Sequence, residues 1–346
     1  MATNKEQNKL NVPHLRFPEF HGEWEEHGLS EYLDFKNGLN PDSKRFGKGI
    51  KFISVMDILN NPVITYDCIR ASVQATDAEM SSFSVEYGDI LFQRSSETLE
   101  DVGRANVYID DKVAVFGGFV IRGKKKANYN PLFFRYLLSS PYARKRIIPM
   151  GAGAQHFNIG QEGLSKVLLN FPSIEEQTKI ASLLHLLDER IATQSKLIED
   201  LKKLKSAIIE NVFDDKHSER LQLDNVGSYI RGLTYSSNDV VEHGGTLVMR
   251  SNNIVNGSLL DYNNNVVFVN KQMSAEQQLQ NGDIVICMAN GSSSLVGKSS
   301  FYDGNWHSPI TVGAFCGIYR SKEPIVKWLF QTNKYRRYIW NSLQEW

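Results

Sequence analysis

The sequence predicts a mixed α/β protein of α+β type, with two repeated globular domains separated by one long coiled-coil-type helix. A capped run with helical periodicity occupies the middle of the 346 residues. Short β-like runs and turns flank it on both sides, and the order of signals before it returns after it. We therefore expect an N-terminal arm and first domain at 1–171, the helix at 172–213 and a second domain at 214–346.

The central helix is predicted by its start and by its apolar period. Ser173 can cap it, and Glu176 three residues later completes a capping box. No Gly or Pro interrupts residues 174–213, so the helix would be roughly 60 Å long. Apolar residues recur at alternating spacings of four and three, which is a heptad seam. The seam consists of Ile180, Leu184, Leu187, Ile191, Ile198, Leu201, Ile208 and Val212, with Gln194 and Lys205 as its polar members.

Such a seam indicates a partner along the whole helix, and we expect its apolar residues to form a subunit interface. The alternative is a long packing helix inside one large domain. Helices of this length without internal caps are uncommon in single globular domains, which favours a helical spacer.

Composition excludes little. The chain contains 39 Lys and Arg against 39 Asp and Glu, so net charge argues neither for nor against a nucleic-acid partner. The first twenty residues have no apolar core of a signal peptide, and no run is long enough to cross a bilayer, so we expect no membrane association and a cytoplasmic protein. Cys68, Cys287 and Cys316 are far apart and form no CxxC pair, which favours buried thiols over a disulfide framework or a zinc site.

The first domain begins with a polar arm at 10–26, whose scattered aromatic residues predict packing on a neighbouring element. Short β-like runs then alternate with turns and with a helix-like segment at 131–147. These runs lie at 50–55, 89–94, 105–109 and 119–122.

The repeat is found by aligning the chain with itself at an offset of about 194 residues. A near-constant offset over such a distance is hard to obtain by chance, so the chain is predicted to contain two copies of one domain. The matching positions are Gly38-Leu39 with Gly232-Leu233, Ile58 with Ile254, Gly88-Asp89-Ile90 with Gly282-Asp283-Ile284, Val102-Gly103 with Val296-Gly297, Tyr108 with Tyr302, Phe119 with Phe315, Pro131 with Pro324, Tyr142 with Tyr335 and Arg144 with Arg337.

The two copies differ in one place. Residues 88–108 and 282–302 share their ends, while the polar residues between those ends differ. A conserved scaffold that carries a variable loop is typical of a recognition surface.

No constellation typical of catalysis is found. Residues 291–299 resemble a P-loop but have five residues between the glycines where that motif has four, and 151–160 lacks the third glycine of a dinucleotide fingerprint. His21 and His27 do not form an HExxH motif. We therefore expect no catalytic residue, no bound metal and no cofactor.

Candidate binding residues are more numerous. Lys and Arg can neutralise phosphates, and Arg, Asn and Gln can make paired contacts with base edges. Any one of these residues alone is more often a solvated surface group, and Gln155 and His156 could also belong to a simple turn, so the prediction rests on the set. The predicted DNA contacts are Lys44, Arg45, Lys48, Lys51, Arg94, Ser95, Ser96, Arg104, Lys124, Lys125, Gln155, His156, Arg231, Arg250, Asn252, Asn253, Asn290, Ser292, Ser293 and Lys298.

The sequence resembles the specificity subunit of Type I restriction-modification enzymes. The similarity is carried by PSIEEQTKIASLLHLLDERI and IEDLKKLKSAIIENVF within 172–213, by LRFPEF followed by Trp24, by the two GDI strands and by the GAGAQHFNIG run at 151–160. It extends over essentially the whole chain.

This resemblance implies a non-catalytic subunit in which each repeat is a target recognition domain that reads one half of a bipartite DNA sequence. The helix would set the gap between the halves and dock two modification subunits, and restriction subunits would join through them. S-adenosylmethionine, ATP and Mg²⁺ would be bound by those partners, which agrees with the missing catalytic motifs.

The family pairs two such helices antiparallel, and the offset predicts the second at about 366–407, beyond Trp346. We therefore expect the seam to pair with a second copy, with a companion fragment or with helices of the modification subunit. Two other functions stay open: a truncated subunit that binds modification subunits without directing them, and the recognition half of a fused methyltransferase-nuclease.

Overall fold

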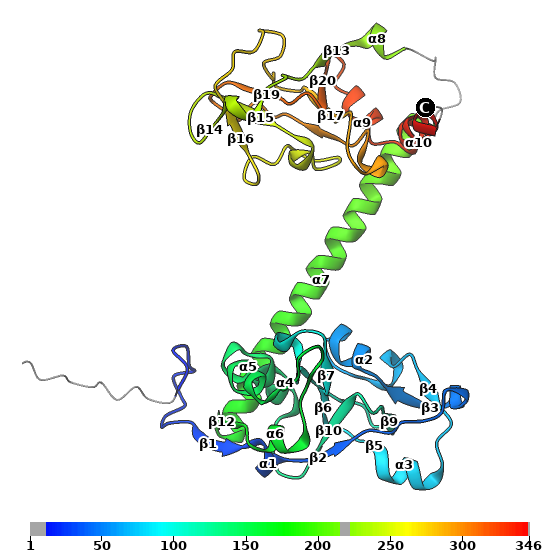
Figure 1. Ribbon diagram of the computed structural model, residues 1–346, viewed down its shortest axis with the longest axis vertical. Coiled ribbons are helices and arrows are strands. Elements are labelled where there is room, and N and C mark those ends of the chain that lie inside the picture. Colours follow the sequence, from blue (N-terminus) through cyan, green and yellow to red (C-terminus); the bar gives the residue numbers. More distant parts are fainter. Residues whose placement is uncertain (1–11, 215–221, 345–346) are drawn as a thin grey trace, which may run out of the picture. The chain divides into compact units, whose positions relative to one another are not determined.

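The computed structural model describes residues 12–214 and 222–344. Residues 1–11, which include the first two residues of the arm predicted at 10–26, lie outside the described residues, as do 215–221 at the start of the predicted second domain. The chain divides into two compact units, 1–193 and 194–346, and the boundary falls inside helix α7, Ile174–Phe213 (Figure 1). The predicted fold class, with two sheet-rich domains and a long helix between them in the sequence, is confirmed.

The first unit holds repeat 1, which is built around a four-stranded antiparallel sheet of order β2-β10-β6-β8. A second sheet, of order β4-β3-β9-β5, contains the parallel pair β3 and β9. In chain order the elements are β1 Glu25–Gly28, α1 Leu29–Tyr32, β2 Leu33–Asn37, η1 Ser43–Arg45, β3 Phe46–Ile53, α2 Val55–Asn60, η2 Tyr66–Cys68, β4 Ser72–Val73, α3 Asp77–Phe83, β5 Ser84–Val85, β6 Ile90–Gln93, β7 Ser95–Ser96, η3 Leu99–Asp101, β8 Ala105–Val107, β9 Ala114–Phe116, β10 Val120–Lys125, α4 Pro131–Ser139, α5 Pro141–Ile147, η4 Ile148–Met150, β11 Phe157–Asn158, α6 Gln161–Ser165 and β12 Leu168–Phe171.

Strand β6 explains how both faces of the main sheet are buried. Successive side chains of a strand point to opposite faces. Ile90 and Phe92 therefore pack in one core cluster with Phe134 of α4, while Leu91 packs in another with Phe116 of β9. A strand covered on both faces is apolar throughout, which is why residues 90–92 carry no polar side chain.

The predicted strand runs correspond to β3, β6, β8 and β10, and 131–147 to α4 and α5. The run 50–55 is corrected at its end, because β3 stops at Ile53 and Ser54 is the N-cap residue of α2. The Asp57 carboxylate accepts hydrogen bonds from the Ser54 backbone N–H and hydroxyl, each at 2.7 Å. This local capping turn stops the strand.

At the start of α7, the predicted cap is confirmed but the predicted capping box is not. Ser173 Oγ accepts the Glu176 backbone N–H at 3.3 Å, so Ser173 is the cap. The Glu176 carboxylate does not complete the box among the described residues; it accepts Arg16 at 2.7 and 2.8 Å and Trp24 Nε1 at 3.3 Å. The arm therefore packs on α7 as expected, through a buried carboxylate.

The second unit holds repeat 2, whose main sheet has the corresponding order β13-β20-β17-β18. A parallel pair, β15 with β19, again occurs in the second sheet, as β3 with β9 does in repeat 1. The predicted repeat is thus present as a repeated topology. The elements are α8 Leu223–Val226, β13 Gly227–Arg231, η5 Ser237–Asp239, β14 Val240–Val241, β15 Thr246–Met249, η6 Ser251–Asn253, β16 Val267–Val269, β17 Ile284–Cys287, η7 Ser293–Leu295, β18 Ser299–Phe301, β19 Ile310–Val312, β20 Cys316–Ser321, α9 Val326–Leu329 and α10 Asn333–Gln344.

The carboxyl-terminal half of α7 packs on repeat 2 within the second unit. Lys205 donates to the Gly257 carbonyl at 2.7 Å and lies 5.0 Å from the Trp328 ring centroid. Glu210 accepts the Asn333 backbone N–H at 2.6 Å. Lys205 interrupts the apolar seam because it makes these contacts.

Candidate nucleic-acid interface

The variable loop of repeat 1, residues 94–104, connects β6 to β8 and is closed by backbone hydrogen bonds. The Gly103 N–H donates to the Gln93 carbonyl at 2.9 Å, and the Arg94 N–H donates to the Phe119 carbonyl at 2.9 Å. Gly103 has φ +67°, a conformation that favours glycine. The loop is therefore tied at both ends to the main sheet.

The variable loop of repeat 2, residues 288–298, is closed in the same way. The Gly297 N–H donates to the Cys287 carbonyl at 2.8 Å, and the Met288 N–H donates to the Phe315 carbonyl at 2.9 Å. Gly297 has φ +81°. The closure is thus a property of the repeated scaffold and does not depend on the side chains between the ends.

Loop 94–104 is joined to a segment that follows it by about 60 residues in the chain. Strand β7 pairs with β11, and the side chains of Ser95 and Asn158 are hydrogen-bonded. The turn before β11 carries Gln155 and His156, both exposed. The structure therefore brings these two predicted contacts to the same edge as Arg94 and Ser95. Ser96 is largely buried, at 9% exposure, and its hydroxyl accepts the Thr98 N–H at 3.2 Å.

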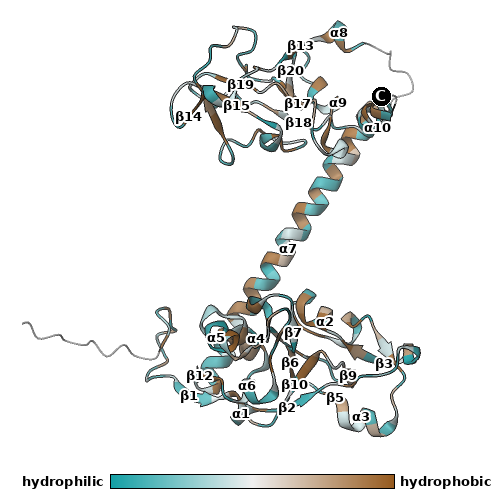
Figure 2. Ribbon diagram, in the orientation of Figure 1, coloured by the Kyte–Doolittle hydropathy of each residue, from teal (hydrophilic) through white to brown (hydrophobic). Residues whose placement is uncertain are grey.

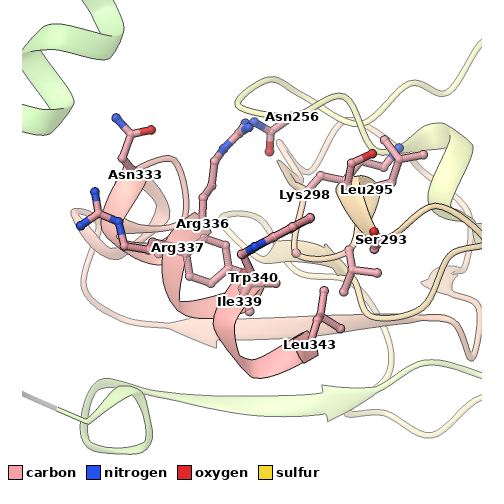
Figure 3. A pocket seen from close by; sticks show the side chains of 14 residues that line it. Asn256, Ser293, Leu295, Lys298, Asn333, Arg336, Arg337, Ile339, Trp340 and Leu343 are labelled. Atoms are coloured by element: carbon pink, nitrogen blue, oxygen red, sulfur yellow. The ribbon is translucent and has the colours of Figure 1, made fainter. Parts of the chain in front are cut away.

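Loop 288–298 faces helix α10 across a cavity of about 570 Å³. Ser293 and Lys298 line it from the loop, while Arg336 and Arg337 line it from α10. Figure 3 shows Arg336 extending from the helix toward Asn256. Asn290 accepts the Ser292 N–H at 3.0 Å within the loop. Beside loop 94–104, a second hollow of about 460 Å³ is lined by Arg104, Arg135 and Arg144.

Of the other predicted basic residues of repeat 1, Arg104 is the last residue of loop 94–104, and the rest lie on other elements. Arg45 binds Glu79, which lowers the pKa of that carboxyl to about 2, and Lys51 donates to the Ile69 carbonyl at 2.7 Å. Lys44 and Lys48 are exposed on η1 and β3. Lys124 and Lys125 lie at the far end of β10, Arg104 pairs with Asp101 at 2.6 Å, and Lys124 pairs with Glu86 at 3.3 Å.

Repeat 2 places Arg250 and Asn252 beside the start of its variable loop. Both line a hollow of about 410 Å³ together with Phe315. Arg231 is exposed at the end of β13, and its backbone carbonyl accepts the Gln277 amide at 3.1 Å.

Asn253 is corrected from a DNA contact to a structural residue, because its side chain is fully buried. Its amide oxygen accepts the Arg250 N–H at 2.9 Å, and its amide nitrogen donates to the Asp261 and Asn264 carbonyls at 3.1 and 2.7 Å. It closes the capping turn that Asp57 closes in repeat 1.

The predicted interface residues of α7 differ in exposure. Ile180 is half-buried and packs against the core of repeat 1, and its assignment to a subunit interface stays a prediction. Leu184 is half-buried and borders a hollow next to Trp24. The remaining members are about half exposed: Leu187, Ile191, Ile198, Leu201 and Ile208. Figure 2 shows apolar residues recurring along the exposed length of α7.

Two aromatic residues at these edges were not among the predicted contacts. Phe119 and Phe315 are 69% and 72% exposed, and the carbonyl of each anchors the first residue of its variable loop. Their equivalence was available from the repeat alignment, but their exposure depends on the turn geometry, which the sequence does not give.

In the part of the chain that the structure describes, no cluster of three or more His, Cys, Asp or Glu side chains could hold a metal ion. Also within this part, no helix combines the length and the apolar character needed to span a bilayer.

Comparison with known proteins identifies the family. Residues 21–203 match the family described as Type I restriction modification DNA specificity domain. The chain belongs to this family. The resemblance drawn from the sequence is therefore confirmed.

Individual relatives agree with the family. The chain is 37% identical over 106 residues to the Type I restriction enzyme EcoKI specificity subunit of Escherichia coli K12, which covers 29% of this chain and 22% of that protein. It is 24% identical over 214 residues to the putative type I restriction enzyme MjaX specificity subunit of Methanocaldococcus jannaschii, covering 60% and 49%. A third match, 35% over 102 residues, is the StySPI specificity subunit of Salmonella potsdam, covering 28% and 21%. The chain thus spans from about a fifth to about half of these relatives.

The fold is also that of a solved structure. The Type-I restriction-modification system S subunit from M. genitalium superposes with a TM-score of 0.53 at 16% identity, covering 91% of this chain and 79% of that one. At this identity the likeness concerns the fold alone.

Proposed function

We propose that the chain is a non-catalytic DNA-specificity subunit of a Type I restriction-modification complex. Each repeat reads one half of a bipartite double-stranded DNA target, and α7 sets the gap between the halves. Two modification subunits dock on the chain, and restriction subunits join through them. Methylation, cleavage and ATP hydrolysis occur in those partners, and the complex works in the cytoplasm, where its DNA is.

One observation carries the proposal: the two variable loops are closed identically and differ in what they present. Both are tied by the N–H of a positive-φ glycine at one end and by a phenylalanine carbonyl at the other. Loop 94–104 presents Arg94 and Ser95, whereas loop 288–298 presents Asn290 and Ser292. Two equal scaffolds with different polar surfaces suit a target whose two halves differ in sequence.

The exposed seam of α7 supports a docking role for the helix. Ile191 is 65% exposed and Ile198 is 53% exposed, and covering such a side chain stabilises an interface by roughly 1.5 to 3 kcal/mol. In the full complex the helices of the modification subunits would cover it. In their absence a second copy or a companion fragment would do so.

The function is tested by sequencing the methylome of a cell that carries this chain with its modification subunit, against the same cell without the chain. A new bipartite motif is the expected result. A palindromic motif would mean that two copies each read with repeat 1. No new motif, while the modification subunit still co-purifies, would show that the chain assembles without directing methylation, and the proposal would be wrong.

An enzyme that contains this chain as its recognition half is tested separately. Such a methyltransferase-nuclease would bind S-adenosylmethionine, so calorimetry of the isolated chain with that compound distinguishes the two functions. Binding in the micromolar range would favour the enzyme.

The docking role is tested by light scattering of the isolated chain. We expect concentration-dependent association, and Ile198→Asp should weaken it by at least about 10-fold. Lys196→Asp is the matched control, because Lys196 is equally on the exposed helix but outside the seam. A monomer at every concentration, with or without the substitution, would contradict self-association.

A further inference from the structure

Phe119 and Phe315 hold the same position in two equivalent turns. Gly117–Val120 and Gly313–Cys316 are four-residue turns closed by an N–H to carbonyl hydrogen bond, of 2.9 Å in the first and 2.8 Å in the second. In each turn the phenylalanine is the third residue. Among the described residues no other phenylalanine exceeds the 41% exposure of Phe46.

A single exposed aromatic side chain is ordinary in a soluble protein. The recurrence of the same residue at the same turn position, with the same exposure, is not explained by the fold. The ring contributes little to either core, since about two thirds of it is in water. Covering it with a partner would be favourable, because apolar surface would leave water.

Both turns are held rigidly. The Phe119 carbonyl accepts the Arg94 N–H, and the Gly118 carbonyl accepts Arg94 Nη1 at 3.2 Å. In repeat 2 the Phe315 carbonyl accepts two N–H groups, from Met288 at 2.9 Å and Ala289 at 3.1 Å. An aromatic side chain on a fixed turn loses little conformational entropy when it binds.

The chemistry around Phe315 suits a base rather than a protein core. Among the described residues, those lining the hollow beside it include Arg250, Asn252 and Tyr235 and no acidic side chain. Arg250 Nη2 donates to the Asn265 carbonyl at 2.9 Å, while its buried Nε has no hydrogen-bond partner within the described part of the chain. Guanidinium, amide and aromatic groups together are the means by which proteins contact base edges and faces.

We propose that Phe119 and Phe315 are base-contacting residues, each making an apolar contact with a base in one half of the DNA target. The proposal rests on the proposed function. It adds the turns 117–120 and 313–316 to the recognition surface and assigns one turn to each half-site. The contact is with a thymine methyl group or with a base face, both of which a phenyl ring can cover.

The test uses the full chain in complex with its modification subunit and a duplex containing the methylated motif. Phe119→Ala and Phe315→Ala should each weaken binding by roughly 5- to 100-fold. The dependence of affinity on salt should keep its slope, because no phosphate contact is lost. Base substitutions in one half-site should lower the affinity of the Phe119→Ala complex less than that of the unchanged complex. Base substitutions in the other half-site should have the same smaller effect on the Phe315→Ala complex.

Controls separate a base contact from a general effect of removing an exposed aromatic ring. Tyr338→Ala in repeat 2 and Phe46→Ala in repeat 1 remove rings that are 70% and 41% exposed, and both should leave binding unchanged. Phe119→Leu should restore part of the affinity, since it keeps an apolar side chain.

The outcomes distinguish this inference from the function on which it rests. If the unchanged complex binds no sequence specifically, both fail. If it binds specifically and the two alanine variants bind equally well, only the assignment of the phenylalanines is wrong. If the variants fail to assemble with the modification subunit on gel filtration, the rings contact protein and the base contact is overturned.

Discussion

The two repeats close their variable loops identically, yet they cover them differently. In repeat 1 Val102, Ile147 and Ile159 are all at most 1% exposed, because Ile159 enters from the segment after α5. In repeat 2 the counterpart Val296 is partly exposed, and so is Ile339, which lies against Gly297 as Ile147 lies against Gly103. The neighbouring Trp340 is 50% exposed beside the 570 Å³ cavity. Since the closing hydrogen bonds agree within 0.1 Å, the loop conformation is set by strands and turns and not by the covering layer.

Each repeat also has a buried carboxylate at the equivalent position, and the two carboxylates have different hydrogen-bond partners. Asp89 accepts the Glu86 and Lys125 backbone N–H groups at 3.0 and 2.9 Å, and burial raises its pKa. Asp283 accepts the Gln280 N–H and also pairs with Arg320 at 2.7 Å. The position equivalent to Arg320 in repeat 1 is Lys124, which is exposed and pairs with Glu86 instead. Repeat 2 therefore depends on a side-chain ion pair where repeat 1 depends on backbone donors.

The largest expected loss of stability comes from removing the Asp283–Arg320 ion pair of repeat 2. Arg320→Met leaves the Asp283 carboxylate, 2% exposed, without its partner, and should destabilise repeat 2 by about 3 kcal/mol. Lys124→Met, at the equivalent surface position, should change repeat 1 by less than about 0.5 kcal/mol. Hydrogen exchange measured by mass spectrometry at increasing denaturant reports each unit separately. Equal losses of stability from Arg320→Met and Lys124→Met would contradict the inference that only repeat 2 depends on a side-chain ion pair.

The second prediction concerns the loop glycines. A Cβ on Gly103 would lie 2.7 Å from the Ile147 side chain and 3.3 Å from Ile159, whereas the atoms nearest to one on Gly297 belong to Ile339, at 3.0 Å. Both substitutions strain a positive φ at about 1–2 kcal/mol, and only Gly103→Ala adds overpacking in a closed core. We expect losses of about 2–3 kcal/mol for Gly103→Ala and about 1–2 kcal/mol for Gly297→Ala.

The same exchange experiment measures this pair. Val102→Ala serves as a control for the general sensitivity of the repeat 1 core. A larger loss from Gly297→Ala than from Gly103→Ala would mean that the covering layer is not what distinguishes the two loops.

The fold could be predicted from the sequence where its signals are local or periodic. The seam and the absence of Gly and Pro located α7 at Ile174–Phe213, and the self-alignment located two equal sheets. The capping box failed at Glu176 because Arg16, 160 residues away, competes for the carboxylate with two charge-assisted hydrogen bonds. Such long-range choices leave no local trace in the sequence.

The candidate site was less predictable than the fold. Residue type suggested Asn253 as a base contact, but its side chain closes the same capping turn as Asp57 in repeat 1, which only the structure shows. The pairing of β7 with β11, which brings Gln155 and His156 beside Arg94, depends on two-residue strands. Strands so short carry no period, so the sequence could name these residues without showing that they share an edge.

The third prediction tests whether the open cavity makes repeat 2 looser. Burial raises the pKa of the Cys287 thiol and raises that of Cys316 to about 12, and only the thiolate reacts quickly. At neutral pH a thiol reagent should therefore modify the half-buried Cys68 at least about 10-fold faster than either cysteine of repeat 2. As a control, the three cysteines should be modified at equal rates in denaturant. Rapid modification of Cys287 in the native protein would show that strand β17 opens.

The smallest expected effect concerns the pair β1 and β12, which has no counterpart among residues 222–344. His27 on β1 binds Glu31 at 2.9 Å and lies 3.4 Å from Glu25, and the bond to Glu31 raises the pKa of the imidazole. A raised folded-state pKa means that protonation stabilises repeat 1 fully below about pH 6.5. That contribution is lost as pH rises through the higher folded-state value. Because the carboxylates are exposed, it should be below about 1 kcal/mol. His27→Gln should therefore reduce the stability of repeat 1 at pH 5.5 but not at pH 8.5, and it should leave repeat 2 unchanged. An equal loss of stability at both pH values would show that His27 acts by packing against Tyr32 and Phe171 rather than by its charge.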